Sequence, residues 1–206
     1  EELIQNYKKA ITVIPANEVI IQAVIKSESD GLYSACFLYN KDHAIQSFVG
    51  RRARQHPPDF GNATTFAQII ENDELEGLAI KILNEIEYTG LCEVEFMHDK
   101  NDNKFKFLEI NPRTWKWHSI ANKANVNILE SYVQLLSNKP LSKKKKADFA
   151  SFRHLVTDIP TLLKYKQKKL YKKYPKYPLQ YAVWDKKDLM PFIFEIIYLP
   201  ITIFKR

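Results

Sequence analysis

Glycine is scarce in this sequence, with 5 among 206 residues. A loop that wraps a phosphate group needs several glycines close together, so no glycine-rich phosphate loop can be drawn within this chain. Cysteine is scarcer still, and its two positions, Cys36 and Cys92, lie in apolar runs typical of strands. Two cysteines provide neither a disulfide framework nor a zinc-ligand spacing, which predicts buried, reduced thiols.

A long apolar run is also missing, so we do not expect a membrane-spanning helix. The nearest candidate, residues 189–204, contains Glu195 and two prolines, which argue against a span. No signal peptide is visible, because the opening "EELIQNYKKA" is acidic and amphipathic. The sequence does not begin with Met, which leaves open whether it is a piece of a longer protein. We expect a cytoplasmic protein, and contact with the inner face of the membrane stays open.

Positive charge is present in excess, with a net charge of +7, and it is concentrated after residue 140 in "SKKKKADF" and "KYKQKKLYKKYPKY". This shift predicts a boundary between residues 1–140 and a basic, aromatic extension of helical or irregular structure at 141–206. The extension could be an interfacial membrane anchor, a helix docked on the core, or a face that meets another part of the protein. Docking on the core is the favoured interpretation.

The pattern of apolar residues predicts an α+β fold, with an antiparallel sheet flanked by helices. Strands are expected at residues 17–26, 32–40, 44–54, 89–99 and 104–111. Helices are expected at residues 1–10, 65–88 and 117–138, with Asn72 or Asp73 as a cap or break in the second of them. The strands at 89–99 and 104–111 are separated by "KNDN", which predicts a hairpin.

That hairpin carries an unusual set of polar residues. Alternation of strand side chains places Glu93 and Glu95 on one face, and Glu109 and Asn111 on one face. If the strands pair as the turn indicates, Glu95 and Glu109 lie side by side and three carboxylates and an amide converge. Like charges at such positions are tolerated when a cation lies between them, and oxygen ligands suit Mg²⁺ or Mn²⁺. Arg113, just beyond the strand, suits a phosphate. The alternative is a solvated sheet face.

The run "GLCEVEF", a short turn and "FLEINPR" together resemble the metal-binding hairpin of the ATP-grasp superfamily. The resemblance covers about residues 10–130 and is closest to the carboxylate–amine ligase group that includes D-aspartate ligase-like proteins. It implies the C-terminal half of an ATP-grasp domain. The glycine-rich lid and phosphate-contacting lysines of that family lie upstream of its hinge, so an upstream half or a second copy is an expected partner.

The resemblance also implies roles for individual residues. Glu95 matches the metal ligand on the first strand, Glu109 the carboxylate that bridges two metals, and Asn111 the amide ligand of the second metal. Arg113 matches the arginine beside the transferred phosphate. Basic residues that face phosphate or the substrate carboxylate in the group correspond to Arg51, Arg52 and Arg54, of which Arg52 and Arg54 are expected to be catalytic and Arg51 to bind the nucleotide.

The hinge of the family, whose backbone meets the adenine edge, corresponds to Gln22, Ala23, Val24 and Ile25. The sequence departs from the common hinge pattern here. It reads "QAVIKS", with Ala23 in place of an acidic residue and Lys26-Ser27 in place of Pro-Gly. Nucleotide contact at this segment is therefore the weakest part of the resemblance.

The function implied by the resemblance is ATP-dependent ligation. A small-molecule carboxylate would form an acylphosphate with MgATP, and an amine would then displace phosphate and form an amide. ATP and Mg²⁺ or Mn²⁺ are the implied cofactors. The alternative is a catalytically incomplete binding module whose basic tail contacts an anionic membrane or a partner protein. No RNA-binding fingerprint or helix-turn-helix is seen, so nucleic acid is not an expected partner.

Overall fold

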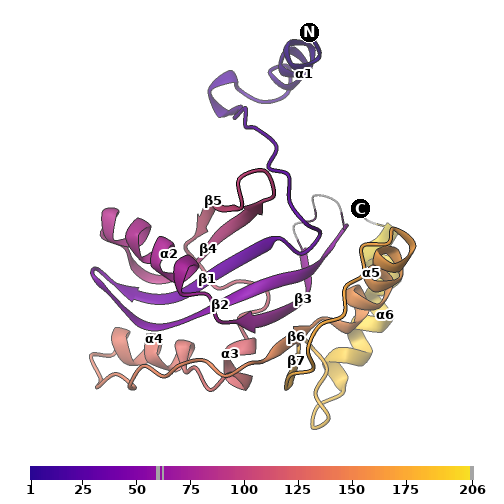
Figure 1. Ribbon diagram of the computed structural model, residues 1–206. Coiled ribbons are helices and arrows are strands. Elements are labelled where there is room, and N and C mark those ends of the chain that lie inside the picture. The colour runs from indigo at the N-terminus through magenta and orange to yellow at the C-terminus, as the bar shows by residue number, and fades with distance from the viewer. Residues whose placement is uncertain (59–60, 62, 205–206) are drawn as a thin grey trace.

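A computed structural model describes residues 1–58, 61 and 63–204, and its strands form one sheet (Figure 1). The strand order is β5-β4-β1-β2-β3-β6-β7, and neighbours are antiparallel except for the parallel pair β6 and β7. Their bounds are β1 Leu32–Asn40, β2 His43–His56, β3 Ala63–Ile70, β4 Thr89–Asp99, β5 Lys104–Asn111, β6 Ser151–Arg153 and β7 Leu179–Tyr181. The expected α+β class is confirmed.

Helices flank the sheet. Their bounds are α1 Glu2–Ala10, α2 Asp73–Glu85, α3 Ile120–Lys123, α4 Ile128–Leu136, α5 Leu155–Gln167 and α6 Met190–Phe204, with a short 3₁₀ helix, η1, at Ala16–Glu18. Helix α1 stands apart from the body, whereas α5 and α6 lie together beside β6 and β7 (Figure 1). In the described part of the chain, no helix is both long enough and apolar enough to cross a membrane.

Two apolar clusters cover the two faces of the sheet. On one face, Phe37 and Val94 pack with Leu75 and Leu83 of α2. The other face packs against α3, α4 and the segment before them. Cys36 and Cys92 are buried free thiols, as expected. The second face is the one that positions the candidate site, because the polar residues of the hairpin point to it.

The expected helix at 65–88 is wrong in its first part. Residues 65–70 belong to β3, and α2 begins only at Asp73. The sequence "ATTFAQII" is rich in β-branched residues, which favour a strand when a neighbouring strand is available for pairing. Asn72 caps the helix, because its side-chain oxygen accepts a hydrogen bond of 2.9 Å from the backbone nitrogen of Leu75.

The expected strand at 17–26 is also wrong. Apart from η1, these residues form an irregular segment with no strand partner, and Ile20 and Val24 are 79% and 78% exposed. A strand needs a partner for its backbone groups, and none of the described strands pairs with this segment. The expected helix at 117–138 is divided into α3 and α4, with Asn125 between them in the left-handed region at φ 56°.

The segment beyond residue 140 contributes to the same sheet. Strand β6 pairs with β3 through Phe66 and Arg153, and β7 pairs with β6. Helix α5 packs beside β2 and β3, where Tyr165 is buried. A division of the chain at residue 140 therefore stays a prediction, and the extension is attached to the sheet edge next to β3.

Candidate functional site

The site starts from the hairpin of β4 and β5. Glu95 pairs with Glu109, and Glu93 pairs with Asn111, so the expected side-by-side placement of Glu95 and Glu109 is confirmed. The register shifts by one residue between Glu95 and Phe96, a bulge that lies directly beside the carboxylate pair. The hairpin therefore holds two carboxylates next to each other at the point where its regular pairing is interrupted.

The amide of Asn111 lies between these two carboxylates. Its Nδ2 donates to Glu95 Oε1 at 3.0 Å and to Glu109 Oε1 at 3.2 Å. Two carboxylate oxygens thus converge on one point, as the ligands of a cation do. Both are hard oxygen donors, and rotation of the amide would add Asn111 Oδ1, so the residues present fit Mg²⁺ or Mn²⁺.

Two arginines approach the same group. Arg52 Nη1 lies 2.5 Å from Glu95 Oε2, and both residues are buried. Arg113 Nη2 donates to Asn111 Oδ1 at 3.1 Å, and its side chain is exposed. Arg52 therefore compensates the charge of Glu95, whereas Arg113 lies at the mouth of the site, where it can meet an anion from solvent.

Glu93 does not join the expected metal group. It is 3% exposed, and Oε1 accepts a hydrogen bond of 3.1 Å from Trp117 Nε1. Burial, and secondarily the charge of Glu95, raise the pKa of Glu93 to about 7, against an opposing effect of Arg52. Across the described residues, no three His, Cys, Asp or Glu side chains are gathered to hold a metal, so the expected convergence of three carboxylates is wrong.

A tryptophan fixes the position of this carboxyl group. Trp117 is 1% exposed and lies over Gly50, where a Cβ atom would come within 2.4 Å of the indole Cη2. Trp115 is buried beside it, with ring centroids 6.1 Å apart. Both tryptophans belong to the apolar core on this face of the sheet, and glycine at position 50 allows the Trp117 indole to approach the sheet closely.

Two cavities open next to the carboxylates. The smaller measures about 100 Å³ and is lined by Arg52, Thr64, Glu93, Glu95, Arg113, Trp115, Lys116 and Trp117. The larger measures about 490 Å³, and its apolar lining consists of Val24, Ile25, Leu32, Pro58, Met97 and Leu170. A polar, charged cavity thus stands beside a wider and mostly apolar one.

The strand register shows that these cavities are neighbours. Leu32 pairs with Arg52 on β2 and with Met97 on β4, so the three side chains share one face of the sheet. Met97 follows Glu95 by two residues on β4, which places its side chain about 7 Å further along the same face. Sequence analysis missed Met97 and Leu32, although the spacing of Met97 from Glu95 predicts their common face.

The structure divides the four expected hinge residues. Val24 and Ile25 line the larger cavity, whereas Gln22 and Ala23 are exposed and do not line it. The backbone approaches the cavity here without forming a strand. Of the four residues expected to contact the nucleotide, Val24 and Ile25 therefore lie at the cavity, and Gln22 and Ala23 do not.

The remaining arginines of "GRRAR" lie elsewhere. Arg51 lies on the opposite face from Arg52 because neighbouring strand residues alternate. Arg51 pairs with Gln68 and Arg54 with Phe66, so the bulge between them places Arg54 on the face of Arg51 as well. Arg51 Nη1 lies 3.5 Å from Asp30, and Arg54 binds Asp158 of α5 through Nε and Nη2 at 2.8 Å each. Their expected roles toward phosphate or substrate stay predictions, and the pairing of Arg54 with a buried aspartate explains its position structurally.

Comparisons with known proteins identify similar sequences and similar folds. The family model of the carbamoyl-phosphate synthase L chain, ATP binding domain, matches residues 62–144. Acetyl-CoA carboxylase of Saccharomyces cerevisiae is 23% identical over 171 residues, which are 79% of this chain and 7% of that protein. Acetyl-CoA carboxylase of Schizosaccharomyces pombe is 20% identical over 152 residues, with 69% and 6% covered. The chain thus spans less than a tenth of these relatives.

Solved structures share the fold. The biotin carboxylase domain of the Hydrogenobacter thermophilus 2-oxoglutarate carboxylase, a dimer in complex with MgADP, ADP and bicarbonate, superimposes with a TM-score of 0.55 at 17% identity and covers 72% of this chain and 34% of that one. The Campylobacter jejuni biotin carboxylase, in complex with β,γ-ATP, gives 0.52 at 18% identity, with 68% and 32% covered. At these identities the solved structures show a shared fold alone, and support for the ATP-grasp superfamily comes from the family model over residues 62–144.

Proposed function

We propose that this chain is the nucleotide- and metal-binding half of an ATP-grasp ligase of the carboxylate–amine type. The observation that carries the proposal is the placement of the Glu95–Glu109 pair beside the larger, apolar cavity on one face of the sheet. The resemblance of the hairpin sequence to the carboxylate–amine ligase group adds the reaction class. The substrate class rests on that resemblance alone.

A nucleotide fits this face in one orientation. The flat, apolar base would occupy the larger cavity against Leu32, Met97 and Val24. The phosphates would then extend toward the smaller cavity, where Arg52 and Arg113 provide positive charge. The larger cavity also contains Lys26 and Lys100, but the reverse orientation would move the phosphates away from Arg52, Arg113 and the Glu95–Glu109 pair.

The metal ligands would be Glu95, Glu109 and Asn111. These residues would hold Mg²⁺, which would supply positive charge against the charge that develops on the transferred phosphoryl group. Asn111 would turn its Oδ1 toward the ion, and this would release Arg113 from its present hydrogen bond of 3.1 Å. Arg113 would thereby become available to hold the transferred phosphoryl group at the mouth of the site.

The reaction needs no covalent nucleophile from the protein. A carboxylate oxygen of the substrate would bond to the γ-phosphorus while the bond to ADP breaks, which gives an acylphosphate. The amine would then attack the acyl carbon and release inorganic phosphate, which leaves an amide and a proton. Arg52 and Arg113 would stabilise the phosphate charge in both steps.

A further protein part would complete the site. The segment before β1 exposes Val13, Ile20, Ile21 and Val24, whose side chains are between 59% and 84% exposed. Exposed apolar side chains in series favour contact with another protein surface. We propose that an upstream half of the ATP-grasp domain, or a second copy, covers this segment and closes the larger cavity.

Calorimetric titration of MgATP into the chain tests the proposal. We expect heat that disappears with EDTA and an affinity about tenfold or more weaker in Glu109→Gln, because this change removes a charged metal ligand and preserves shape. Glu85→Gln on α2 is the matched control, since Glu85 is exposed on the opposite face of the sheet.

The outcomes separate the ligase from its alternatives. Mg²⁺-dependent heat in the parent and the control, with loss in Glu109→Gln, supports the site, and release of ADP with candidate acids and amines then tests the reaction. If ATP bound equally well in the presence of EDTA and to the Glu109→Gln variant, this would contradict the proposed site. Absence of binding, even after an upstream ATP-grasp half is supplied, would refute the ligase function itself.

A further inference from the structure

Helix α6 packs on the rest of the protein through its one charged residue, Glu195. Glu195 contacts His154, the residue before α5, through His154 Nε2. On the same side of the helix, Phe192 packs edge-to-face on Trp184, with ring centroids 5.0 Å apart. The one charged side chain within α6 therefore faces inward, which is the reverse of an ordinary surface helix.

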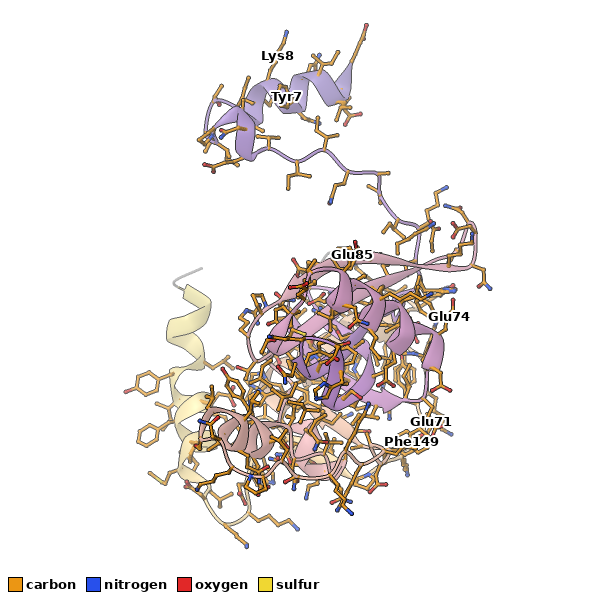
Figure 2. All side chains as sticks on the ribbon, turned by 90° about the vertical axis from the view of Figure 1, so that its left-hand side faces the viewer. Tyr7, Lys8, Glu71, Glu74, Glu85 and Phe149 are labelled. Atoms are coloured by element: carbon orange, nitrogen blue, oxygen red, sulfur yellow. The ribbon has the colours of Figure 1, made fainter. Side chains whose placement is uncertain are left out.

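The outward side of α6 is apolar. Side chains project from this helix away from the body of the protein (Figure 2). Those that are 42–59% exposed are Met190, Ile193, Phe194, Ile196, Ile197 and Tyr198. A contiguous row of large apolar side chains in water is unfavourable, so this surface is built for an apolar environment.

Positive charge surrounds the same part of the protein. Residues 141–206 contain 16 Lys and Arg against 5 Asp and Glu, a net charge of +11, whereas residues 1–140 contain 15 against 19, a net charge of −4. Lys186 and Lys187 are exposed directly before α6, and Lys164 and Lys166 are exposed on the neighbouring helix α5. Figure 1 shows α5 and α6 together at one end of the sheet.

We propose that α6 is an interfacial anchor that binds an anionic lipid surface. Its outward side chains would enter the boundary between headgroups and acyl chains, and the lysines beside it would meet the negative headgroups. The inward contact between Glu195 and His154 keeps the opposite side of α6 on the protein, so the helix lies along the lipid surface.

Two other occupants fit the surface less well. A second copy meeting α6 through the same face would bring two regions of net charge +11 together, which opposes association. Nucleic acid matches the lysines, yet it offers no apolar surface for Ile193, Phe194 and Ile197. A lipid surface with anionic headgroups satisfies both the charge and the apolar row.

Vesicle flotation tests the proposal on the intact chain. Vesicles of phosphatidylcholine alone are compared with vesicles that also contain phosphatidylglycerol. We expect binding to the anionic vesicles only, with about tenfold or greater weakening in the double variant Ile193→Ser/Ile197→Ser and in Lys186→Glu/Lys187→Glu. The matched control is Val133→Ser/Leu136→Ser on α4, whose side chains are 60% and 66% exposed.

Each outcome decides the proposal. The proposal is supported if the α6 variants bind anionic vesicles more weakly than the parent while the α4 control binds as the parent does. All of these proteins must also have similar thermal unfolding midpoints. No binding to anionic vesicles, or equal binding by the Ile193→Ser/Ile197→Ser variant, overturns the proposal. Self-association that the same variant abolishes, in the absence of vesicle binding, would assign the surface to a second copy. If the chain bound oligonucleotides in a salt-sensitive way but did not bind vesicles, and the Ile193→Ser/Ile197→Ser variant bound oligonucleotides equally well, the basic residues would be assigned to nucleic-acid binding.

Discussion

The close approach of Trp117 to Gly50 makes a strong prediction about stability. In Gly50→Ala, the new Cβ would lie 2.4 Å from Trp117 Cη2 and 2.7 Å from Cζ3. Both atoms belong to a rigid ring that is 1% exposed, so neither can move without repacking the cluster around it. Displacement of the indole would also break its hydrogen bond of 3.1 Å to Glu93.

The magnitude follows from these two effects. Overpacking of a filled core costs about 1–3 kcal/mol, and a buried polar group that loses its partner costs about the same. We therefore expect Gly50→Ala to reduce the free energy of unfolding by roughly 3 kcal/mol. For a domain of this size, that corresponds to a decrease of about 6–12 °C in Tm, measured by circular dichroism or calorimetry.

Gly77→Ala on α2 is the matched control. An added Cβ at Gly77 has nothing within 4 Å, and the position lies inside a helix. Alanine there is expected to stabilise the protein by about 0.5–1 kcal/mol. A Gly50→Ala protein with an unchanged Tm and an unchanged near-ultraviolet tryptophan spectrum would refute the reasoning about the Trp117 contact.

Two further predictions concern buried charges. Arg54→Met is expected to lower the stability by about 1–3 kcal/mol, since it removes both hydrogen bonds of 2.8 Å to the buried Asp158 while Arg153 Nε stays 2.9 Å from that carboxylate. The MgATP affinity of the folded protein is expected to be unchanged, and a selective loss of affinity at an unchanged Tm would contradict this structural role. Glu93→Gln is expected to change the pH dependence of unfolding measured in EDTA. Because the pKa of Glu93 is raised from 4.5 to about 7 in the fold, the parent loses stability as the pH rises through 7, and the variant should be more stable by about 3 kcal/mol at pH 8 and similar at pH 4. If the variant and the parent differed in stability by the same amount at both pH values, this would contradict the raised pKa of the buried Glu93 carboxyl group.

The hairpin was predictable from the sequence because its information is local. Alternation and a short polar turn predict two paired antiparallel strands. The register set by the turn, Asp99 with Lys104, would place Leu108 opposite Glu95, and the bulge beside Glu95, which no local pattern reveals, brings Glu109 there instead. The strand β3 was not recognised, because "TFAQII" precedes a helix without a glycine or proline to separate them. Its strand conformation comes from pairing with β2, which no local pattern reveals.

The neighbours of the carboxylates depend on contacts between distant segments. Alternation places Arg51 and Arg52 on opposite faces of β2, whereas the bulge turns Arg54 away from the face of Arg52, and a run of three arginines within four residues gives no sign of that bulge. The Trp117–Glu93 hydrogen bond and the apolar cavity beside Met97 likewise join residues that are far apart in the chain. Sequence reasoning brought Glu95, Glu109 and Asn111 together and missed Leu32 and Met97, which line the larger cavity.

The most direct test of the nucleotide–metal site is anomalous diffraction from crystals grown with Mn²⁺ and ADP. We predict an anomalous peak between Glu95 and Glu109 within coordination distance of both carboxylates, and adenine density in the cavity lined by Leu32 and Met97. Mn²⁺ at another position, or adenine density away from that cavity, would contradict the central claim.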